Sequence, residues 1–146
     1  GTYPLPEAQI DRFTMRVRMG YPGVQAEREM LRRYMVQHVA TTPRVLEPGL
    51  VTDLQALAET VHVDDEVIEY VVALAEHTRQ SRRLALGASP RAALQLLSAS
   101  KARALLDGRS FVLPDDVKAL AAPVLAHRLL VSAESDTDQA AELAVR

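Results

Sequence analysis

The sequence predicts an all-α fold, built as a small helical bundle with a short N-terminal helix and strand in front of it. Its 146 residues are 48% hydrophobic and 25% charged, which is typical of a globular domain with its own core. Ala and Leu dominate while aromatic residues reach only 4%, which favours helices. From about residue 24 onward, apolar residues return every three or four positions, as in helices that pack one face.

Composition excludes several classes of function. The chain has 17 Lys and Arg against 19 Asp and Glu, and its formal net charge of -2 argues against a nucleic-acid partner. The absence of Cys excludes disulfides and thiolate metal sites. No apolar run is long enough to span a bilayer and no signal peptide is visible, so we expect a cytoplasmic protein with no membrane partner.

The first part of the chain does not look like the start of an independent domain. Residues 4–13 can form a short helix, with Pro6 near its start and Glu7 in its first turn. Polar and apolar residues then alternate over 14–19, which predicts a half-buried strand. A lone strand either pairs elsewhere in the chain or has lost its natural neighbours, and we favour the second interpretation.

The Gly- and Pro-rich residues 20–23 follow and indicate a linker or domain boundary. We therefore expect residues 1–20 to be the remnant of a preceding domain, loosely attached, and residues 21–146 to form the helical domain.

Five helices are expected after this boundary: residues 25–39, a helix after Pro48, residues 65–80, residues 89–106, and residues 114–127 with a kink or break at Pro123. Residues 132–138 are expected to be a surface loop and residues 139–146 a final turn or two. The faces predicted to point inward are, in helix order, Met30, Leu31, Tyr34, Met35 and His38; Val51, Leu54, Leu57, Ala58 and Val61; Val67, Ile68, Val71, Val72, Leu74, Ala75 and Thr78; and Leu94, Leu97, Ala104 and Leu105.

The stretch at residues 87–92 carries the strongest local signal. Ser89 is a good N-cap, and Pro90 then occupies the first helical position, where its missing N–H costs nothing. Arg91 opposes the helix dipole, which favours anions at this end. An arginine there suits a phosphate partner, because free amides and a planar guanidinium can bind several oxygens. The alternative is an exposed, slightly unfavourable arginine.

Familiar catalytic and metal-binding motifs are missing. The four histidines are scattered without ligand spacing, so we expect surface or edge residues and no metal site. No phosphate-loop or dinucleotide-binding glycine motif occurs, and Ser89 stands before a proline rather than in a nucleophile turn. Alone, the chain shows no complete catalytic apparatus. The histidines are His38, His62, His77 and His127.

Two stretches together resemble a known family. Residues 1–13 closely resemble a signature of the MoxR family of AAA+ ATPases, and residues 87–92 resemble that family's sensor 2 motif. Further landmarks agree in the right order, so the resemblance covers nearly the whole chain. One departure is Leu113, where the family usually has a capping Thr or Ser. The other landmarks are residues 62–64, 70–79, 105–109 and 127–129.

This resemblance implies a C-terminal fragment: the tail of a nucleotide-binding domain plus a helical lid. The phosphate loop, the Walker B acids and sensor 1 would precede Gly1, so ATP and Mg are expected in the full-length parent and no cofactor in this fragment. The resemblance makes Arg12 the arginine-finger candidate, acting on a neighbouring subunit's nucleotide. It makes Arg91 the sensor 2 candidate, contacting the phosphates in its own subunit. Otherwise, Arg12 would be a surface residue paired with Asp11 or Glu7.

The resemblance also implies partners. These are the AAA+ core domain, neighbouring subunits of a homo-oligomeric ring (a hexamer), and proteins with a von Willebrand factor A domain. The parent would be a chaperone-like remodeller or would mature metal centres in partner proteins. Two alternatives stay open: the lid of a related AAA+ machine such as a magnesium-chelatase-type motor, and a non-catalytic helical interaction module.

Overall fold

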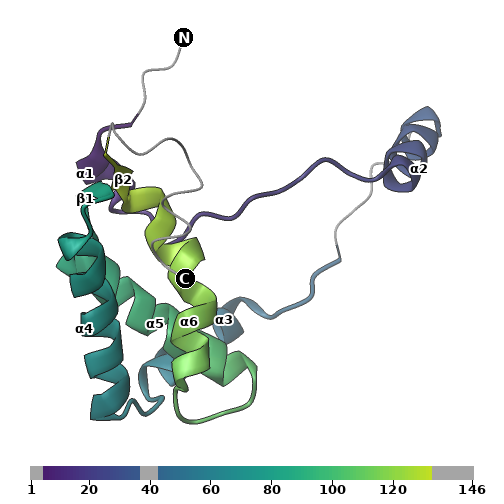
Figure 1. The fold of residues 1–146 in the computed structure, drawn as a ribbon. Helices are drawn as coiled ribbons and strands as arrows, with labels where there is room; N and C mark the ends of the chain where they lie inside the picture. Colours follow the sequence, from purple (N-terminus) through teal and green to yellow (C-terminus); the bar gives the residue numbers. More distant parts are fainter. Residues whose placement is uncertain (1–4, 37–42, 133–146) are drawn as a thin grey trace.

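The computed structural model describes residues 5–36 and 43–132, and these confirm the all-α prediction (Figure 1). Besides the helices, the described chain contains a two-stranded antiparallel ribbon that the sequence did not predict. The elements in order are α1 (Glu7–Ile10), α2 (Val24–Met35), α3 (Pro48–Glu59), α4 (Asp65–Gln80), β1 (Leu84–Leu86), α5 (Pro90–Leu106), α6 (Pro114–Leu125), the 3-10 helix η1 (Ala126–Arg128) and β2 (Leu130–Val131).

Helix α5 is the centre of the bundle and packs against α3, α4 and α6. Its buried residues recur every fourth position, and most of them are small, so neighbouring helices can approach closely. The predicted stripe was therefore partly wrong: Leu94 is 69% exposed, while Leu96 fills the core. Ser100 is buried without leaving its hydroxyl unpaired, because the hydroxyl donates to the Leu96 carbonyl at 2.8 Å. The buried stripe is Ala92, Leu96, Ser100 and Ala104.

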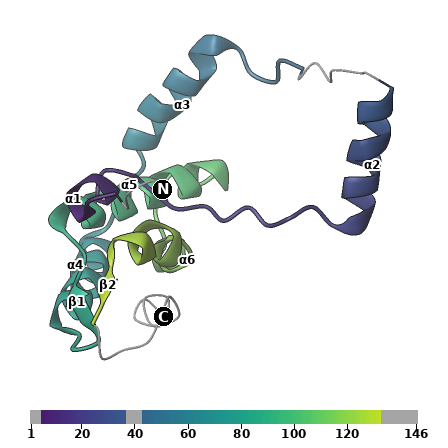
Figure 2. The same cartoon turned by 90° about the horizontal axis from the view of Figure 1, so that it is seen from above.

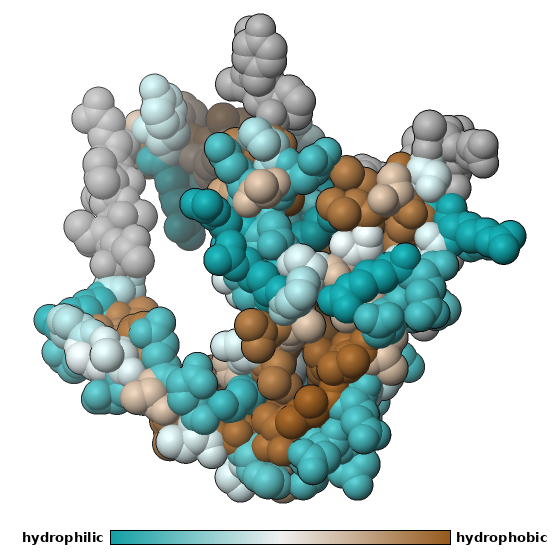
Figure 3. Space-filling view, turned by 90° about the vertical axis from the view of Figure 1, so that its left-hand side faces the viewer, coloured by the Kyte–Doolittle hydropathy of each residue, from teal (hydrophilic) through white to brown (hydrophobic). Residues whose placement is uncertain are grey.

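Helix α4 has the predicted bounds but a narrower buried face. Ile68 and Val72, predicted to point inward, are exposed. The side of the molecule that carries α4 and β1 shows apolar residues gathered among charged ones (Figure 3). Asp64 stands at the N-cap position, yet its carboxylate lies 2.8 Å from His62 Nε2 and makes no side-chain cap bond. The residues of α4 that reach the core are Val67, Val71, Ala75 and Thr78.

Helices α2 and α3 correct the prediction of a compact bundle from residue 24. Both views show α2 standing away from the body formed by α4, α5 and α6 (Figures 1 and 2). The face predicted to be buried is exposed, with Tyr34 at 83% and Met35 at 82%. Helix α3 does contact α5, and Lys101 donates to the Glu59 carbonyl at its C-terminal end, but Val51, Leu54 and Leu57 remain exposed. His38 and residues 133–146 lie outside the described residues.

The strand predicted over residues 14–19 does not form within the described chain. These residues run extended and exposed, joined to the bundle by the Arg16 amide, which donates to the Pro123 carbonyl at 2.9 Å. Alternation of polar and apolar residues predicts extended backbone, but a strand also needs a neighbouring edge. Pro123 lies inside α6, which continues to Leu125 before tightening into η1, so the expected break comes as a change of helix type.

The start of α6 is held by a buried carboxylate. Leu113 occupies the N-cap position and cannot cap with its side chain, but Asp116 accepts from the Leu113 amide at 2.9 Å. Arg109 binds both oxygens of Asp116 at 2.7 Å, and Arg103 lies 3.3 Å from one of them. The Arg109 hydrogen bonds lower the pKa of Asp116 below its ordinary 3.8, and they outweigh the opposing effect of burial on a side chain that is 4% exposed.

We expect Asp116→Asn to destabilise the bundle by about 1.5–3 kcal/mol, the usual range for hydrogen bonds to a charged group. A carboxyl whose pKa is lower in the folded state contributes stability above its unfolded pKa, and this is lost as the pH falls through the folded value. The difference in free energy of unfolding between wild type and Asp116→Asn should therefore be largest above about pH 4 and decrease below it. Urea unfolding at several pH values measures this. Asp115→Asn, at the exposed neighbouring position, is the control, and an equal pH dependence in both variants would contradict the assignment.

Candidate functional site

The N-terminus of α5 has the predicted cap. The Ser89 hydroxyl accepts from the Ala92 amide at 3.1 Å, and Pro90 occupies the first helical position. Arg91 follows at the second position with an exposed side chain, and its own amide has no hydrogen bond among the described residues. The first turn thus offers one free amide and one free-standing cation, which fit the oxygens of a phosphate.

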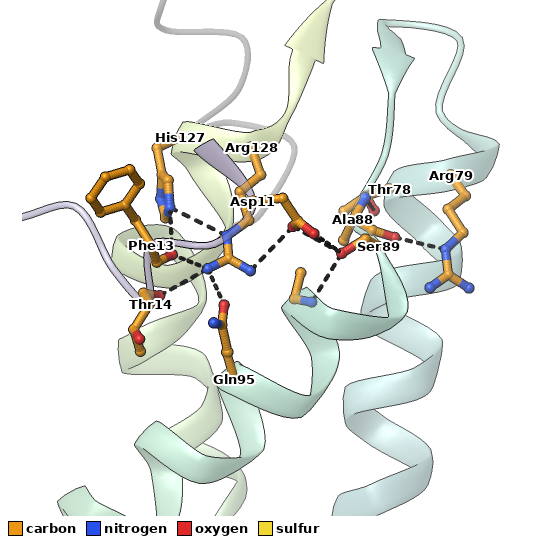
Figure 4. Close-up of polar contacts among 11 residues, drawn as sticks. Asp11, Phe13, Thr14, Thr78, Arg79, Ala88, Ser89, Gln95, His127 and Arg128 are labelled. Carbon is orange, nitrogen blue, oxygen red and sulfur yellow. Dashed lines mark hydrogen bonds and ion pairs between the residues drawn. The ribbon is translucent and has the colours of Figure 1, made fainter. Parts of the chain in front are cut away.

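Helix α4 fixes the residue in front of this cap (Figure 4). The buried Thr78 hydroxyl accepts from the Ala88 amide at 2.9 Å and donates to the Ala75 carbonyl at 2.7 Å. Arg79 Nε donates to the Ala88 carbonyl at 2.8 Å. Both backbone groups of Ala88 are therefore bound by α4, which sets where α5 begins relative to α4.

Gly87 allows this close approach. A Cβ built on Gly87 would lie 2.6 Å from the backbone N and Cα of Arg79, and backbone atoms cannot move aside as a side-chain tip can. The sequence showed this glycine as part of a motif, but the reason for it is a contact with α4.

Arg128 connects the N-terminal segment to the helical bundle, and the sequence assigned it no role. The Arg128 side chain is 3% exposed, and its guanidinium donates to the backbone carbonyls of Phe13 and Thr14 and to Gln95 Oε1 of α5 (Figure 4). Its Nη1 lies 3.4 Å from Asp11 Oδ1. Burial is the main cause of the lowered pKa of Arg128, and the nearby positive charge of Arg91 lowers this pKa further. The negative charge of Asp11 acts in the opposite direction.

Asp11 connects the same segment to the α5 cap. The Ser89 hydroxyl donates to the Asp11 carboxylate, at 2.9 Å from one oxygen and 3.0 Å from the other. Ser89 therefore uses its single proton on Asp11 and a lone pair on the helix amide. These contacts differ from the expected loose attachment, because residues 11–14 and the Arg16 amide are bound to the helical bundle.

The two predicted site arginines lie on either side of this connection. Arg12 is exposed in the turn after α1, between Asp11 and Phe13, and Arg91 is exposed on the first turn of α5. The carboxylate of Asp11 is engaged by Ser89 and Arg128. The structure therefore brings the segments that carry Arg12 and Arg91 together without burying either side chain.

A cavity of about 610 Å³ opens where α1, the end of β1 and the start of α5 meet. Its charged lining is balanced, with Arg79 and Arg128 facing Glu7 and Asp11. Arg91 does not line it, although Ser89 and Pro90 at the start of α5 do. The remaining lining is Ala8 and residues 85–90.

Two histidines have polar neighbours, and neither belongs to a metal cluster among the described residues. His62 pairs with Asp64, as described above, while His127 Nε2 lies 3.1 Å from the Phe13 carbonyl oxygen. Burial is the main cause of the lowered pKa of His127. No group of three or more His, Cys, Asp or Glu side chains in residues 5–36 and 43–132 is placed to hold a metal ion.

Comparison with known proteins agrees with this geometry. The profile of the AAA lid domain matches residues 76–144. The chain is 41% identical to the uncharacterized protein YeaC of Bacillus subtilis over 92% of its length, and 37% identical to chaperone MoxR1 of Mycobacterium tuberculosis over 95%. It covers 42% and 39% of these proteins, and so spans about two fifths of the curated relatives' length.

A solved structure shows the same fold. A crystal structure from Cytophaga hutchinsonii, described as a candidate ATPase, superimposes with a TM-score of 0.86 at 30% identity, covering 100% of this chain and 49% of that one. The chain is also 35% identical to protein MoxR of Paracoccus denitrificans over 90% of its length, and covers 44% of that protein. In the described residues, no helix is long and apolar enough to cross a membrane.

We expect Gly87→Ala to destabilise the chain by about 1–3 kcal/mol, the cost of forcing a methyl group into a filled space. Gly49→Ala is the matched control, because nothing lies within 4 Å of its Cβ position and alanine favours the helix. Thermal unfolding of both variants measures the difference. Equal melting temperatures would show that the approach of Gly87 to α4 is not tight.

Proposed function

Because this chain belongs to the MoxR family of AAA+ proteins, we propose that it is the C-terminal part of an ATPase whose lid senses the bound nucleotide. The observation that carries the proposal is the start of α5. There Arg91 and a free amide stand at a helix N-terminus that α4 fixes in place. Residues 1–20 then belong to the nucleotide-binding core and residues 21–146 form the lid.

Each arginine receives a role in this proposal. Arg91 contacts the phosphates of the nucleotide in its own subunit, which ties the position of the lid to the nucleotide state. Arg12 extends toward the nucleotide of a neighbouring subunit, where a guanidinium stabilises charge that develops during phosphoryl transfer. ATP supplies the transferred group, and the proposal assigns the magnesium ligands to the nucleotide-binding core.

The exposed apolar surface supports a larger assembly. Met15, Val17 and Met19 are exposed on an extended segment, and α2 presents Tyr34 and Met35 to solvent. Large exposed apolar patches usually mark an interface. In the proposal, residues 14–19 pair with the sheet of the ATPase core, and α2 packs against the core or a neighbouring subunit.

The wider role follows the names of relatives. One relative is named a chaperone, so we assign this protein to chaperone-like remodelling of partner proteins. Metal-centre maturation, which the family resemblance implies, is the narrower form of this proposed role. It acts as a homo-oligomeric ring, a hexamer, in the cytoplasm. Proteins with a von Willebrand factor A domain are the partner class to test first.

We expect the 146-residue chain alone to hydrolyse no ATP above the buffer rate, because the described residues contain an arginine for phosphate but no acidic metal site. Phosphate release by the purified chain measures this. Hydrolysis that follows the chain through further purification would refute the proposed division of labour.

In the complete ATPase, Arg12→Ala should spare ATP affinity and lower turnover by about 10³-fold or more, the contribution of arginine fingers in other NTPases. Arg91→Ala should weaken ATP affinity, and Arg91→Lys should rescue it poorly, because a point charge cannot replace a two-pronged donor. Arg83→Ala removes another exposed arginine and is the control. Measured affinity and turnover that change by no more than a few-fold in both Arg12 and Arg91 variants would refute both roles.

A further inference from the structure

We propose that Arg128 is a positioning residue that fixes Arg12 relative to Arg91, so that the two arginines move as one body. This inference rests on the proposed function, because it concerns how a finger for one nucleotide site is coupled to a sensor for another. Four observations carry it: the burial of Arg128, the atoms it binds, the link through Asp11, and the second attachment on α5.

The first observation is the cost of placing Arg128 where it is. Its side chain is 3% exposed, and a buried charge is stable only when it is paired and hydrogen-bonded. The nearest carboxylate oxygen, on Asp11, is 3.4 Å away, so much of the compensation comes from carbonyl groups. Because the buried arginine needs these acceptors, its hydrogen bonds restrict the movement of the residues that carry them.

The second observation is which atoms Arg128 binds. Asp11 precedes Arg12 and Phe13 follows it, and the guanidinium contacts the side chain of the first and the carbonyl of the second. The Thr14 carbonyl accepts from the same nitrogen at 3.2 Å. Arg12 is thus flanked on both sides by groups bound to Arg128, so its backbone is fixed while its side chain stays exposed.

The third and fourth observations tie this segment to α5. Asp11 accepts from the Ser89 hydroxyl, which in turn caps α5 by accepting from the Ala92 amide. Gln95, further along the same helix, accepts from Arg128. Ser89 and Gln95 bracket Arg91 in the sequence, so the segment carrying Arg12 is attached to α5 on both sides of the sensor candidate (Figure 4).

The consequence is mechanical. If a phosphate draws Arg91 and the start of α5 toward it, the displacement passes to Arg12 through Asp11 and Arg128. A nucleotide in one subunit then repositions the finger presented to the next. A residue with only a structural role would stabilise the lid without transmitting this displacement.

Turnover of the complete ATPase tests the inference. Arg128→Ala should lower turnover about 10²-fold, the effect of misplacing a catalytic group by about 1 Å, while ATP affinity changes less than about threefold. Arg128→Lys should rescue turnover only in part, because one ammonium can replace the nitrogen that binds Phe13, Thr14 and Gln95 but not also the second nitrogen, which lies 3.4 Å from Asp11 Oδ1. Arg109→Ala removes a partly buried, ion-paired arginine of the lid and should lower stability with turnover retained.

A double-mutant cycle separates positioning from stability. If Arg128 acts through Arg12, adding Arg128→Ala to Arg12→Ala should lower turnover no further. Independent, multiplying effects would overturn the inference. A fall in turnover with Arg12→Ala but none with Arg128→Ala would overturn the inference and leave the proposed function standing. No effect of Arg12→Ala would remove the finger role itself.

A distance measurement decides the geometry without any activity. The chain has no Cys, so Arg12→Cys and Arg91→Cys give two unique sites for spin labels. We expect a narrow distance distribution between the labels, broadened by Arg128→Ala and unchanged by Arg109→Ala. A distribution that Arg128→Ala leaves equally narrow in the folded chain would overturn the inference.

Discussion

The buried guanidinium of Arg128 is the interaction on which the arrangement of this site depends. A charge removed from water needs acceptors, and Arg128 finds them on residues 11–14 and on Gln95. The N-terminal segment therefore cannot separate from the lid without leaving a buried cation unpaired. This explains why the attachment is tight as far as Thr14, while the residues after Arg16 leave the bundle.

Local chemistry was predictable from the sequence, and distant contacts were not. The cap at Ser89 and the bounds of α4 follow from neighbouring residues, so the predictions were confirmed. The buried stripe of α5 was partly wrong because small residues, not the large leucines, decide where helices approach. Arg128 was missed because three of its partners, Asp11, Phe13 and Thr14, lie more than 100 residues earlier, and only the resemblance to known lids had marked its segment.

Periodicity can show that a face is apolar but not what covers it. Tyr34 and Met35 of α2 fit a buried stripe by spacing, yet they are exposed, as are Val17 and Met19. The chain spans about two fifths of the curated relatives' length, and our proposal assigns these surfaces to contacts with an ATPase core. The prediction was therefore wrong about what α2 packs against, whereas the predicted amphipathic pattern is present in α2.

The charges around α5 also connect the two parts of the proposal. Arg91 stands where the helix dipole is unfavourable to a cation, and its charge lowers the pKa of Arg128. The negative charge of Asp11 offsets part of this lowering, but the Asp11 carboxylate contacts both Arg128 and Ser89. An anion bound at Arg91 would reduce the repulsion from Arg128 and favour the closed network around residues 11–14. Phosphate binding at Arg91 then favours the fixed position of Arg12, and the fixed position of Arg12 favours phosphate binding, because coupling between two sites is reciprocal.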